Sequence, residues 1–441
     1  QVLRVLPRVN DEINEEWISD KTRYAIDGLR NQRLDVPYIR NQSGNLVPST
    51  WEEAFEKIAK KLKKLNSNEF AAISGDLVDV ETLFALKLLF KKLNCPNIDC
   101  RQDGAHLTPN NRPSYIFNSS IAGIDKTDAI LIVGSNPKIE SAVLNARIRK
   151  NFLERKIPIA LIGNKVGLNY DYKFLGDNPN VLSDLLLEKN NFFKILKKAK
   201  KPMIILGMGA LRRKDSESIL NLSFELANET GMFLKDWNGF NVLNVAASRV
   251  GGMDIGFLPG KGGKNTKKII NECHKGKIKL LWMLGADEID VSKIKNSFIV
   301  YQGHHGDNSA KIADVILPGA AYTEKNGIYV NCEGRVQQAI RATFPPGDAK
   351  EDWKIIKAFS DKLNLSLNFD THQSLRNLLF ENFPHFEKFG EIKSSKIKKI
   401  GKSGNLVNEK FNDTFSNFYM TCSISRSSIT MSKCLRELKL I

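Results

Sequence analysis

Two neighbouring histidines and an aspartate are the residues most suited to metal chemistry in this chain. His304, His305 and Asp307 fall within one short polar turn, and imidazole and carboxylate are common zinc ligands. Adjacent residues of an extended segment point to opposite faces, and the spacing fixes no further ligand. The sequence therefore favours a hydrogen-bonded turn over a metal site at this position.

Three carboxylates near this turn could in principle supply an acid–base pair. Asp314, Glu324 and Glu333 lie close together in the sequence, but their spacing does not bring two of them to one point. Glu324 precedes Lys325, and Arg335 follows Glu333 closely. We expect these acids to form ion pairs that hold the structure together.

The cysteines give no clear nucleophile or metal cluster. Cys273 and His274 are adjacent, which is a weak signal, and no serine lies in a G-x-S-x-G elbow. The six cysteines show no C-x-x-C pair, so we expect free thiols in a reducing compartment. From the residues alone we predict no catalytic, cofactor-binding or metal-binding residue. The cysteines are Cys95, Cys100, Cys273, Cys332, Cys422 and Cys434.

Glycines follow four short apolar segments and could form a phosphate cradle. Loops at the carboxyl ends of parallel strands collect at a crevice where phosphates bind. None matches G-x-G-x-x-G, and the nearest, Gly207 to Arg212, has arginine in place of the third glycine. Tight turns that need glycine for backbone reasons are favoured over a nucleotide site. The segments are 129–133 before Gly134, 159–162 before Gly163, 203–206 before Gly207 and 280–284 before Gly285.

The elements that must position these residues alternate between apolar strands and helices. Continuous apolar strands of this kind are typical of a parallel sheet covered on both faces. Two more strands are predicted at 298–301 and 313–317, the latter stopped by Pro318. Thr50 and Glu53 form a capping box for a first amphipathic helix, and another helix is expected around Trp353. The fold class predicted is doubly wound α/β with mostly parallel sheets.

We expect three regions along the chain. Residues 1–48 are predicted to be the end of a β-rich subdomain truncated at its N-terminus, with a hairpin from Tyr38 to Val47. The chain starts at Gln1, without methionine, in what resembles a strand to Pro7, which suggests a processed product or a fragment. Residues 49–345 form the α/β region. Residues 346–441 form a helical segment with a polar loop or mobile linker at about 388–412, which includes Ser394, and a docking segment at 418–440.

The net charge of +17 raises the possibility of nucleic-acid binding. Much of the lysine, however, falls on the polar faces of predicted helices, so solvated lysine-rich faces are favoured over a nucleic-acid surface. No apolar run reaches the roughly 18 residues that cross a bilayer. There is also no N-terminal pattern of a signal peptide, so membrane association is expected only through partners.

Several motifs together carry a resemblance to a known family. The segments 313–319, 324–327 and 331–337 resemble the ADvvLP, E-x-x-G and N-x-E-G-R-x-Q signature of the molybdopterin oxidoreductase superfamily. More narrowly, the segments 4–8, 13–24, 301–307 and 418–421 are similar to the 75 kDa subunit family of mitochondrial NADH:ubiquinone oxidoreductase, respiratory complex I. The similarity extends over essentially the whole chain.

This resemblance implies a molybdopterin-oxidoreductase-like portion of a larger subunit. Its 2Fe-2S and 4Fe-4S clusters would be bound upstream of Gln1, and this portion would be a cofactor-free scaffold. The implied partners are other peripheral-arm subunits, including the flavin-bearing one, with no nucleic acid and no direct membrane span. The implied place is the matrix side of the mitochondrial inner membrane, or alternatively the cytoplasmic face of a bacterial plasma membrane.

Departures from the family pattern bear on its chemistry. Ser19 stands where cluster-bearing relatives have the cysteine of W-x-C-x-K-G-R, and a neutral hydroxyl is a poor iron ligand. Cys95 and Cys100 lie in the broad region of the molybdenum ligand of catalytic relatives, but without matching flanks. An active molybdenum or tungsten pterin oxidoreductase, with pterin near Gly134, Gly163, Gly207 and Gly285, is therefore the alternative, followed by a basic nucleic-acid-binding protein.

Overall fold

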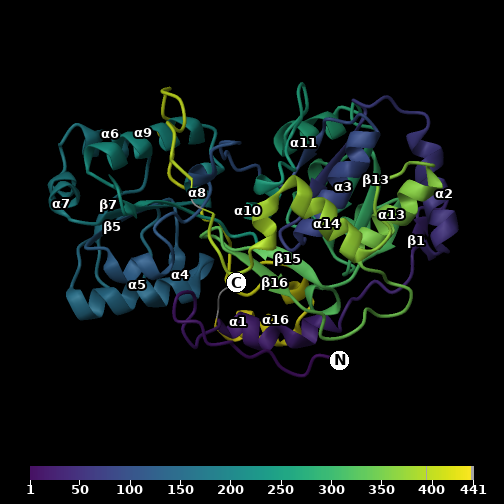
Figure 1. Ribbon diagram of the computed structural model, residues 1–441, viewed down its shortest axis with the longest axis horizontal. Helices are drawn as coiled ribbons and strands as arrows, with labels where there is room; N and C mark the ends of the chain where they lie inside the picture. Colours follow the sequence, from purple (N-terminus) through teal and green to yellow (C-terminus); the bar gives the residue numbers. More distant parts are fainter. Residues whose placement is uncertain (394, 439–441) are drawn as a thin grey trace.

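The computed structural model describes residues 1–393 and 395–438. It contains two lobes, each built on its own sheet, with the N-terminal and C-terminal segments packed together along one side (Figure 1). The second lobe is an insertion, because its strands fall between the fourth and the twelfth strand of the chain. No described helix has the length and apolar character needed to cross a membrane.

The first lobe contains a seven-stranded sheet. Five of its strands are parallel, and the β1–β2 hairpin adds to one edge in antiparallel orientation through β14. The hairpin and the strands expected at 280–284, 298–301 and 313–317 are confirmed. In spatial order the strands are β2 (Leu46–Pro48), β1 (Tyr38–Arg40), β14 (Val315–Pro318), β13 (Phe298–Gly303), β12 (Leu280–Leu284), β3 (Phe70–Ser74) and β4 (Ile98–Asp99).

The main sheet of the second lobe has five strands, all parallel, and an antiparallel pair, β9 (Phe233–Leu234) and β10 (Trp237–Asn238), lies between β8 and β11 in the sequence. Ile130 and Ile132 of its central strand β5 pack into one apolar cluster, whereas Leu131 and Val133 pack into another on the opposite face. Both faces are thus covered, which confirms the doubly wound α/β class. In spatial order the strands are β11 (Phe240–Leu243), β8 (Pro202–Gly207), β5 (Ala129–Val133), β6 (Ile159–Ile162) and β7 (Lys173–Gly176).

Helices cover both faces of each sheet (Figure 1). The capping box of Thr50 and Glu53 begins α2 as predicted, and the aromatic ring of Phe359 in α13 lies between Phe55 and Trp282. In the first lobe the helices are α2 (Trp51–Leu62), α3 (Val80–Lys92), α10 (Arg249–Asp254), α11 (Thr266–His274), α12 (Asn308–Ile312), α13 (Asp352–Lys362) and α14 (His372–Asn382). In the second they are α4 (Pro137–Glu140), α5 (Ala142–Arg155), α6 (Asn180–Leu186), α7 (Phe192–Lys198), α8 (Met208–Leu211) and α9 (Ser216–Glu229).

The two ends of the described chain meet in one small cluster. Helices α1 (Asp20–Tyr24) and η1 (Ala25–Leu29) contact α15 (Ser423–Arg426) and α16 (Ile429–Glu437), as Figure 1 shows. A Cβ added to Gly28 would lie 2.0 Å from the carbonyl oxygen of Ile424, so the backbones touch. Docking of the segment from 418 onward is confirmed, although Leu440 lies outside the described residues.

Two expectations about irregular segments need correction. Gln1 to Pro7 forms no strand, because no described neighbour pairs with it and Leu3 and Leu6 are exposed. The segment 388–412 has no helix or strand among its described residues, as expected for a loop. It packs against the rest of the protein, however, because Ile400 and Phe411 are buried. Ser394, which falls in this loop, is outside the described residues.

Candidate functional site

The four glycine loops are divided between the two sheets. Gly134 and Gly163 follow strands of the second sheet and Gly207 ends β8, where a Cβ on Gly207 would lie 2.5 Å from the carbonyl oxygen of Gly134. Gly285 follows β12 of the first sheet and packs against Gly75, whose added Cβ would lie 1.7 Å from the Gly285 carbonyl oxygen. The strand pattern of the sequence did not reveal that these four loops belong to two different sheets.

Backbone contact explains why glycine occupies these turns. Gly134 has a φ of +59°, and a Cβ there would lie 2.6 Å from the backbone nitrogen of Ala210. A Cβ on Gly209 would lie 2.6 Å from the Gly134 carbonyl oxygen and 2.7 Å from that of Asn412. The glycines thus accommodate protein backbone, which supports the structural explanation.

The C-terminal segment lies across the glycine loops of the second sheet. Asn164 donates to the Asp413 carboxylate at 2.8 Å, and Arg212 donates to the carbonyl oxygen of Asp413 at 3.0 Å. Arg212, which stands in place of the third glycine of G-x-G-x-x-G, thus binds the C-terminal segment where it crosses these loops. A cavity of about 10 Å³ is left beside Gly134, Asn412 and Asp413, whereas ligand pockets measure roughly 300 to 1,000 Å³. The structure therefore leaves little open space beside these glycine loops.

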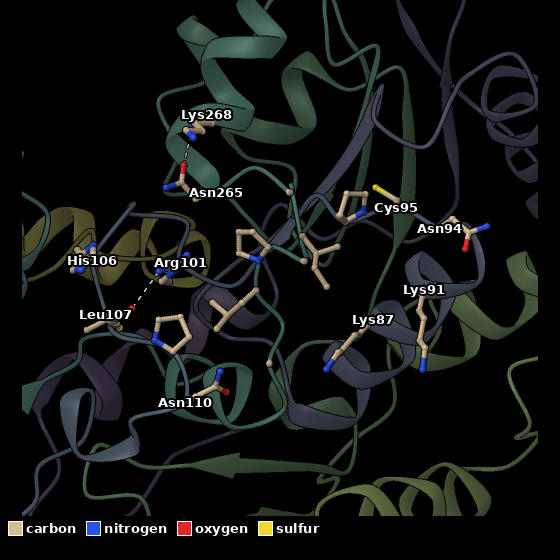
Figure 2. Close-up of a pocket in the computed structure, with 18 residues that line it drawn as sticks. Lys87, Lys91, Asn94, Cys95, Arg101, His106, Leu107, Asn110, Asn265 and Lys268 are labelled. Atoms are coloured by element: carbon tan, nitrogen blue, oxygen red, sulfur yellow. Dashed lines mark hydrogen bonds between the residues drawn. The ribbon is translucent and has the colours of Figure 1, made fainter. Parts of the chain in front are cut away.

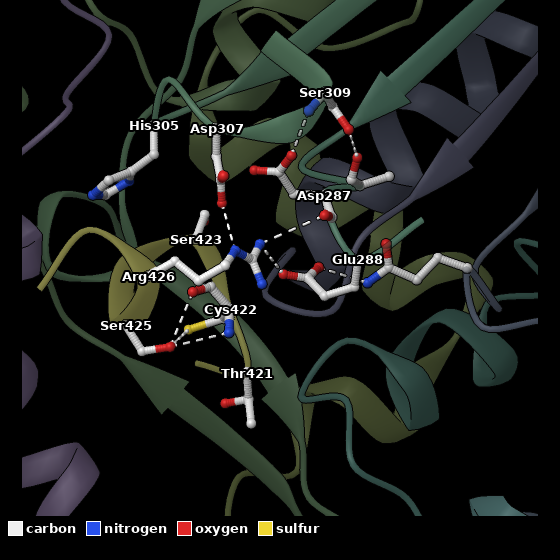
Figure 3. Close-up of polar contacts among 12 residues, drawn as sticks. Asp287, Glu288, His305, Asp307, Ser309, Thr421, Cys422, Ser423, Ser425 and Arg426 are labelled. Atoms are coloured by element: carbon white, nitrogen blue, oxygen red, sulfur yellow. Dashed lines mark hydrogen bonds and ion pairs between the residues drawn. The ribbon is translucent and has the colours of Figure 1, made fainter. Parts of the chain in front are cut away.

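Arg426 closes the corresponding crevice of the first sheet (Figure 3). Its guanidinium lies 2.6 Å from the Asp307 carboxylate and 2.9 Å from that of Glu288, to which Gln102 also donates. Burial, together with the negative charge of Asp76, raises the pKa of Glu288 to about 7, while Arg426 opposes the shift. The carboxylates of Asp307 and Glu288 in this crevice are therefore paired with a cation of the same chain, Arg426.

A buried lysine lies deeper in the same crevice. The Lys325 ammonium lies 2.9 Å from the Asp79 carboxylate and 2.6 Å from that of Asp352. Burial alone would lower the pKa of Lys325, but the two carboxylates raise it well above its ordinary value. Gln302 donates to Asp352 at 3.1 Å. The remaining cavity, lined in part by Lys325 and Ser423, holds about 20 Å³.

The histidine pair forms a hydrogen-bonded turn, as predicted. His305 contacts the carbonyl oxygen of Gly28 through Nε2 at 2.6 Å, and burial lowers the pKa of His305 to about 4. The expectation that the two rings point to opposite faces is wrong, because the Nδ1 atoms of His304 and His305 are 2.5 Å apart. Asp307 turns instead to Arg426. The described residues include no group of three ligating side chains suited to a metal.

The three candidate acids are separated and serve as structural partners. Two guanidinium nitrogens of Arg33 donate to the two carboxylate oxygens of Glu324, at 2.5 and 2.6 Å. Arg335 lies 2.7 Å from Glu333, as expected from the sequence. Asp314 accepts from the backbone of Ile299 at 2.8 Å. The sequence correctly predicted ion pairs for Glu324 and Glu333, but it named Lys325 rather than Arg33 for the first.

The cysteines considered as ligands or nucleophiles are buried. Burial raises the pKa of the Cys95 and Cys100 thiols to about 12 and that of Cys273 to about 11. Thiolate is the reactive and metal-binding form, so these side chains are held in the unreactive state. All six cysteines of the chain are free thiols.

Ser19 caps the first helix. Its hydroxyl accepts from the backbone nitrogen of Thr22 at 3.2 Å, at the start of α1. The hydroxyl of Ser19 thus satisfies a backbone donor at a helix terminus.

A basic groove on the first lobe is a further feature that sequence reasoning missed (Figure 2). The sequence attributes much of the lysine to solvated helix faces and does not single out the lysines that line this groove. The available signal was weak: a stretch rich in glycine and proline, 256–263, that precedes a lysine-bearing helix. Its cavity of about 730 Å³ is lined by residues of α3, of the segment 94–110 and of the segment 256–268.

Comparisons with known proteins now relate this architecture to a family. Residues 33–362 match the model of molybdopterin oxidoreductase, and residues 389–434 match that of the C-terminal region of an NADH-ubiquinone oxidoreductase subunit. Residues 1–27 match an NDSU1/NuoG-like 4Fe-4S domain of NADH-ubiquinone oxidoreductase. Part of an iron–sulfur domain therefore falls inside this chain, whereas the resemblance implied that such regions end before Gln1.

Curated relatives are similar along almost the whole chain. The chain is 42% identical to the NuoG-type subunit of NADH-quinone oxidoreductase from Rickettsia bellii over 99% of its length, covering 62% of that protein. It is 46% identical to the mitochondrial NADH-ubiquinone oxidoreductase 78 kDa subunit of Candida albicans, again over 99% of its length, covering 61% of the relative. The chain thus spans about three-fifths of the length of these relatives.

Solved structures give the same fold at low sequence identity. Acetylene hydratase from Pelobacter acetylenicus superposes with a TM-score of 0.62 at 13% identity, over 89% of this chain and 70% of that one. The formyltransferase/hydrolase complex of Methylorubrum extorquens gives a TM-score of 0.54 at 13% identity, over 75% of this chain and 99% of that one. Together with the match over residues 33–362, these similarities show that the chain belongs to the molybdopterin oxidoreductase family.

Proposed function

We propose that this chain is the molybdopterin-oxidoreductase-like portion of a peripheral-arm subunit of respiratory complex I, in which it serves as a cofactor-free scaffold. Support comes from identities above 40% to NuoG-type and 78 kDa relatives along nearly the whole chain. Electrons would pass from NADH through flavin and iron–sulfur clusters to quinone without any catalytic side chain from this portion.

The observation that carries the cofactor-free role is the crossing of both crevices by the C-terminal segment. Asp413 and Asn412 cover the glycine loops of the second sheet, and Arg426 pairs with Glu288 and Asp307 in the first. The cavities that remain there measure only about 10 and 20 Å³, which supports the proposal that this portion holds no pterin. We infer that no residue of this portion is catalytic or holds a cofactor or metal.

The iron–sulfur clusters of the subunit would be held elsewhere in the longer protein. Residues 1–27, which match the 4Fe-4S domain, contain no cysteine, and Ser19 is engaged as a helix cap. Thiolates are the usual ligands of 2Fe-2S and 4Fe-4S clusters. This portion would support the cluster-bearing part by packing against it.

The proposed setting follows from the relatives. We infer contacts with other peripheral-arm subunits, including the flavin-bearing one, and neither nucleic acid nor a direct membrane span. The 46% identical mitochondrial relative favours the matrix side of the inner membrane over the cytoplasmic face of a bacterial membrane. This portion would contribute to the assembly through large buried interfaces with its neighbours.

Elemental and pterin analysis of the purified chain, together with affinity purification from its native membranes, tests this proposal. We expect less than stoichiometric iron, molybdenum and tungsten, no pterin fluorescence after acid release, and co-purification with NADH:quinone reductase activity. Stoichiometric pterin would instead establish the active molybdenum or tungsten oxidoreductase. Purification without the reductase would overturn the complex I assignment.

A further inference from the structure

The basic groove has a one-sided charge distribution. Lys87, Lys91, Arg101 and Lys268 line its cavity of about 730 Å³, and none of the described lining residues is Asp or Glu. Figure 2 shows Lys87 and Lys91 at one end and Arg101 with His106 at the other. Such an arrangement creates a positive potential that attracts an anionic partner.

Two of these cations are available to a ligand. The ammonium groups of Lys91 and Lys268 are exposed and make no hydrogen bond or ion pair with any described residue. Arg101, in contrast, is held by the Asp99 carboxylate at 2.8 Å, and Lys87 donates to the carbonyl oxygen of Ile255. Burial, and then the positive charge of Lys91, lowers the pKa of Lys87, so an added anion would relieve this repulsion.

The floor between the cations is apolar. It includes leucine and proline side chains, namely Leu107, Leu258, Pro96, Pro109 and Pro259. Rigid, apolar surfaces of this kind bury an aliphatic side chain at little cost in conformational entropy. The groove thus combines separated positive charges with an apolar centre.

The chemistry of the groove argues against a nucleotide. No Phe, Tyr or Trp lines it in the described structure, so a base would find none of the large aromatic rings that commonly stack on bases. Two backbone nitrogens at the start of α11 are also engaged, since Thr266 donates to Asp99 at 3.0 Å and Lys268 donates to the Asn265 side chain at 3.1 Å. These two donors are therefore not free to form a phosphate-binding nest.

We propose that the basic groove binds an acidic segment of a neighbouring polypeptide in which carboxylates flank an apolar residue. Lys91 and Lys268 would contact carboxylates on either side, and the apolar residue would rest on the leucine and proline floor. This inference names a mode of partner contact and so rests on the proposed role in an assembly. Electrostatic complementarity of this kind mainly provides selectivity and rapid association.

Fluorescence anisotropy with a labelled Glu-Glu-Leu-Glu-Glu peptide tests the binding itself on the isolated chain. We expect saturable binding that weakens with salt and is absent for the Gln-Gln-Leu-Gln-Gln peptide. The double variant K91Q/K268Q should bind roughly five- to tenfold more weakly, the sum of two exposed ion pairs. The matched double variant K92Q/K275Q, which removes two exposed lysines that do not line the groove, should bind normally.

Three results would overturn the proposal. One is equal binding of the glutamine peptide, another is equal loss in both double variants, and the third is stronger competition by ATP or a single-stranded oligonucleotide than by the acidic peptide.

Carbodiimide cross-linking of the affinity-purified assembly gives a separate measurement, because it joins lysines to carboxylates in direct contact. We expect cross-links from Lys91 or Lys268 to acidic residues of a neighbouring polypeptide; a failed co-purification would instead contradict the complex I assignment.

Discussion

The crevices at the strand ends and the basic groove differ in how their charges are satisfied. In the crevices at the strand ends, Arg426 and Lys325 are paired with carboxylates, and the cavities that remain measure about 10 and 20 Å³. The basic groove measures about 730 Å³, and the ammonium groups of Lys91 and Lys268 have no described partner. The position that commonly binds ligands in α/β folds serves internal packing here, whereas the outer groove is open to a partner.

Removing the buried lysine should give the largest effect. The substitution Lys325→Ala leaves Asp79 and Asp352 buried without their cation, which typically costs about 3 to 5 kcal/mol of stability. Denaturant unfolding followed by circular dichroism measures this difference. An unchanged midpoint of the unfolding curve would mean that the ion pairs of the crevice contribute no more to stability than the unpaired lysines of the groove.

Removing the arginine of the C-terminal segment should give the next largest effect. Arg426→Ala leaves Asp307 and Glu288 without their shared cation, and because the site is partly exposed we expect a loss of roughly 1.5 to 3 kcal/mol. Limited proteolysis should then cleave the segment around 411–426 faster than in the parent chain. Equal cleavage rates would show that this ion pair does not hold the crevice closed.

The pH dependence of stability offers a third comparison. The pKa of Glu288 is about 7 in the folded chain against 4.5 ordinarily, so the folded state retains a proton that the unfolded state releases. Stability from this group is therefore present at low pH and is lost as the pH rises from about 4.5 to 7.

The substitution Glu288→Gln removes this dependence. Relative to the parent chain, the variant should gain stability across that window, by roughly 1 to 2 kcal/mol after allowance for partial exposure. Thermal unfolding at pH 5 and pH 8 measures the change. Parallel pH profiles of the two proteins would contradict the assignment to Glu288.

The lysines of the groove should contribute least to folding. In the double variant K91Q/K268Q we expect a stability change within about 0.5 kcal/mol, since exposed side chains without partners rarely matter to the folded state. Urea unfolding of this variant beside K92Q/K275Q provides the check. A loss comparable to that of Lys325→Ala would make the groove a structural element, and the contrast between the two regions would disappear.

Sequence patterns predicted the fold well where the local signal was strong. The apolar strands before Gly134, Gly163, Gly207 and Gly285 were found because burial on both faces demands continuous apolar residues. The short strand β4 and the exposed β7 were not predicted, since neither has such a run, and the buried strands β3 and β11 were missed as well. Which strands share a sheet depends on long-range pairing, which no local pattern encodes.

The candidate site was less accessible to sequence reasoning. The sequence indicated ion pairs for Glu324 and Glu333, but the partner Arg33 lies 291 residues from Glu324. The crossing of the crevices by Asp413 and Arg426 is likewise a long-range contact. The groove combines residues from three separate segments, each of which resembles an ordinary solvated surface.

The order of strands in the first sheet constrains how this chain acquires its fold. β12 lies between β3 and β13, although the whole second lobe is synthesised between β3 and β12. The inserted lobe can therefore fold early, while β3 must wait with an unpaired edge until β12 leaves the ribosome. Pairing of such distant segments is slow and leaves an aggregation-prone edge exposed, so the late step in folding falls on the first lobe rather than on the inserted one.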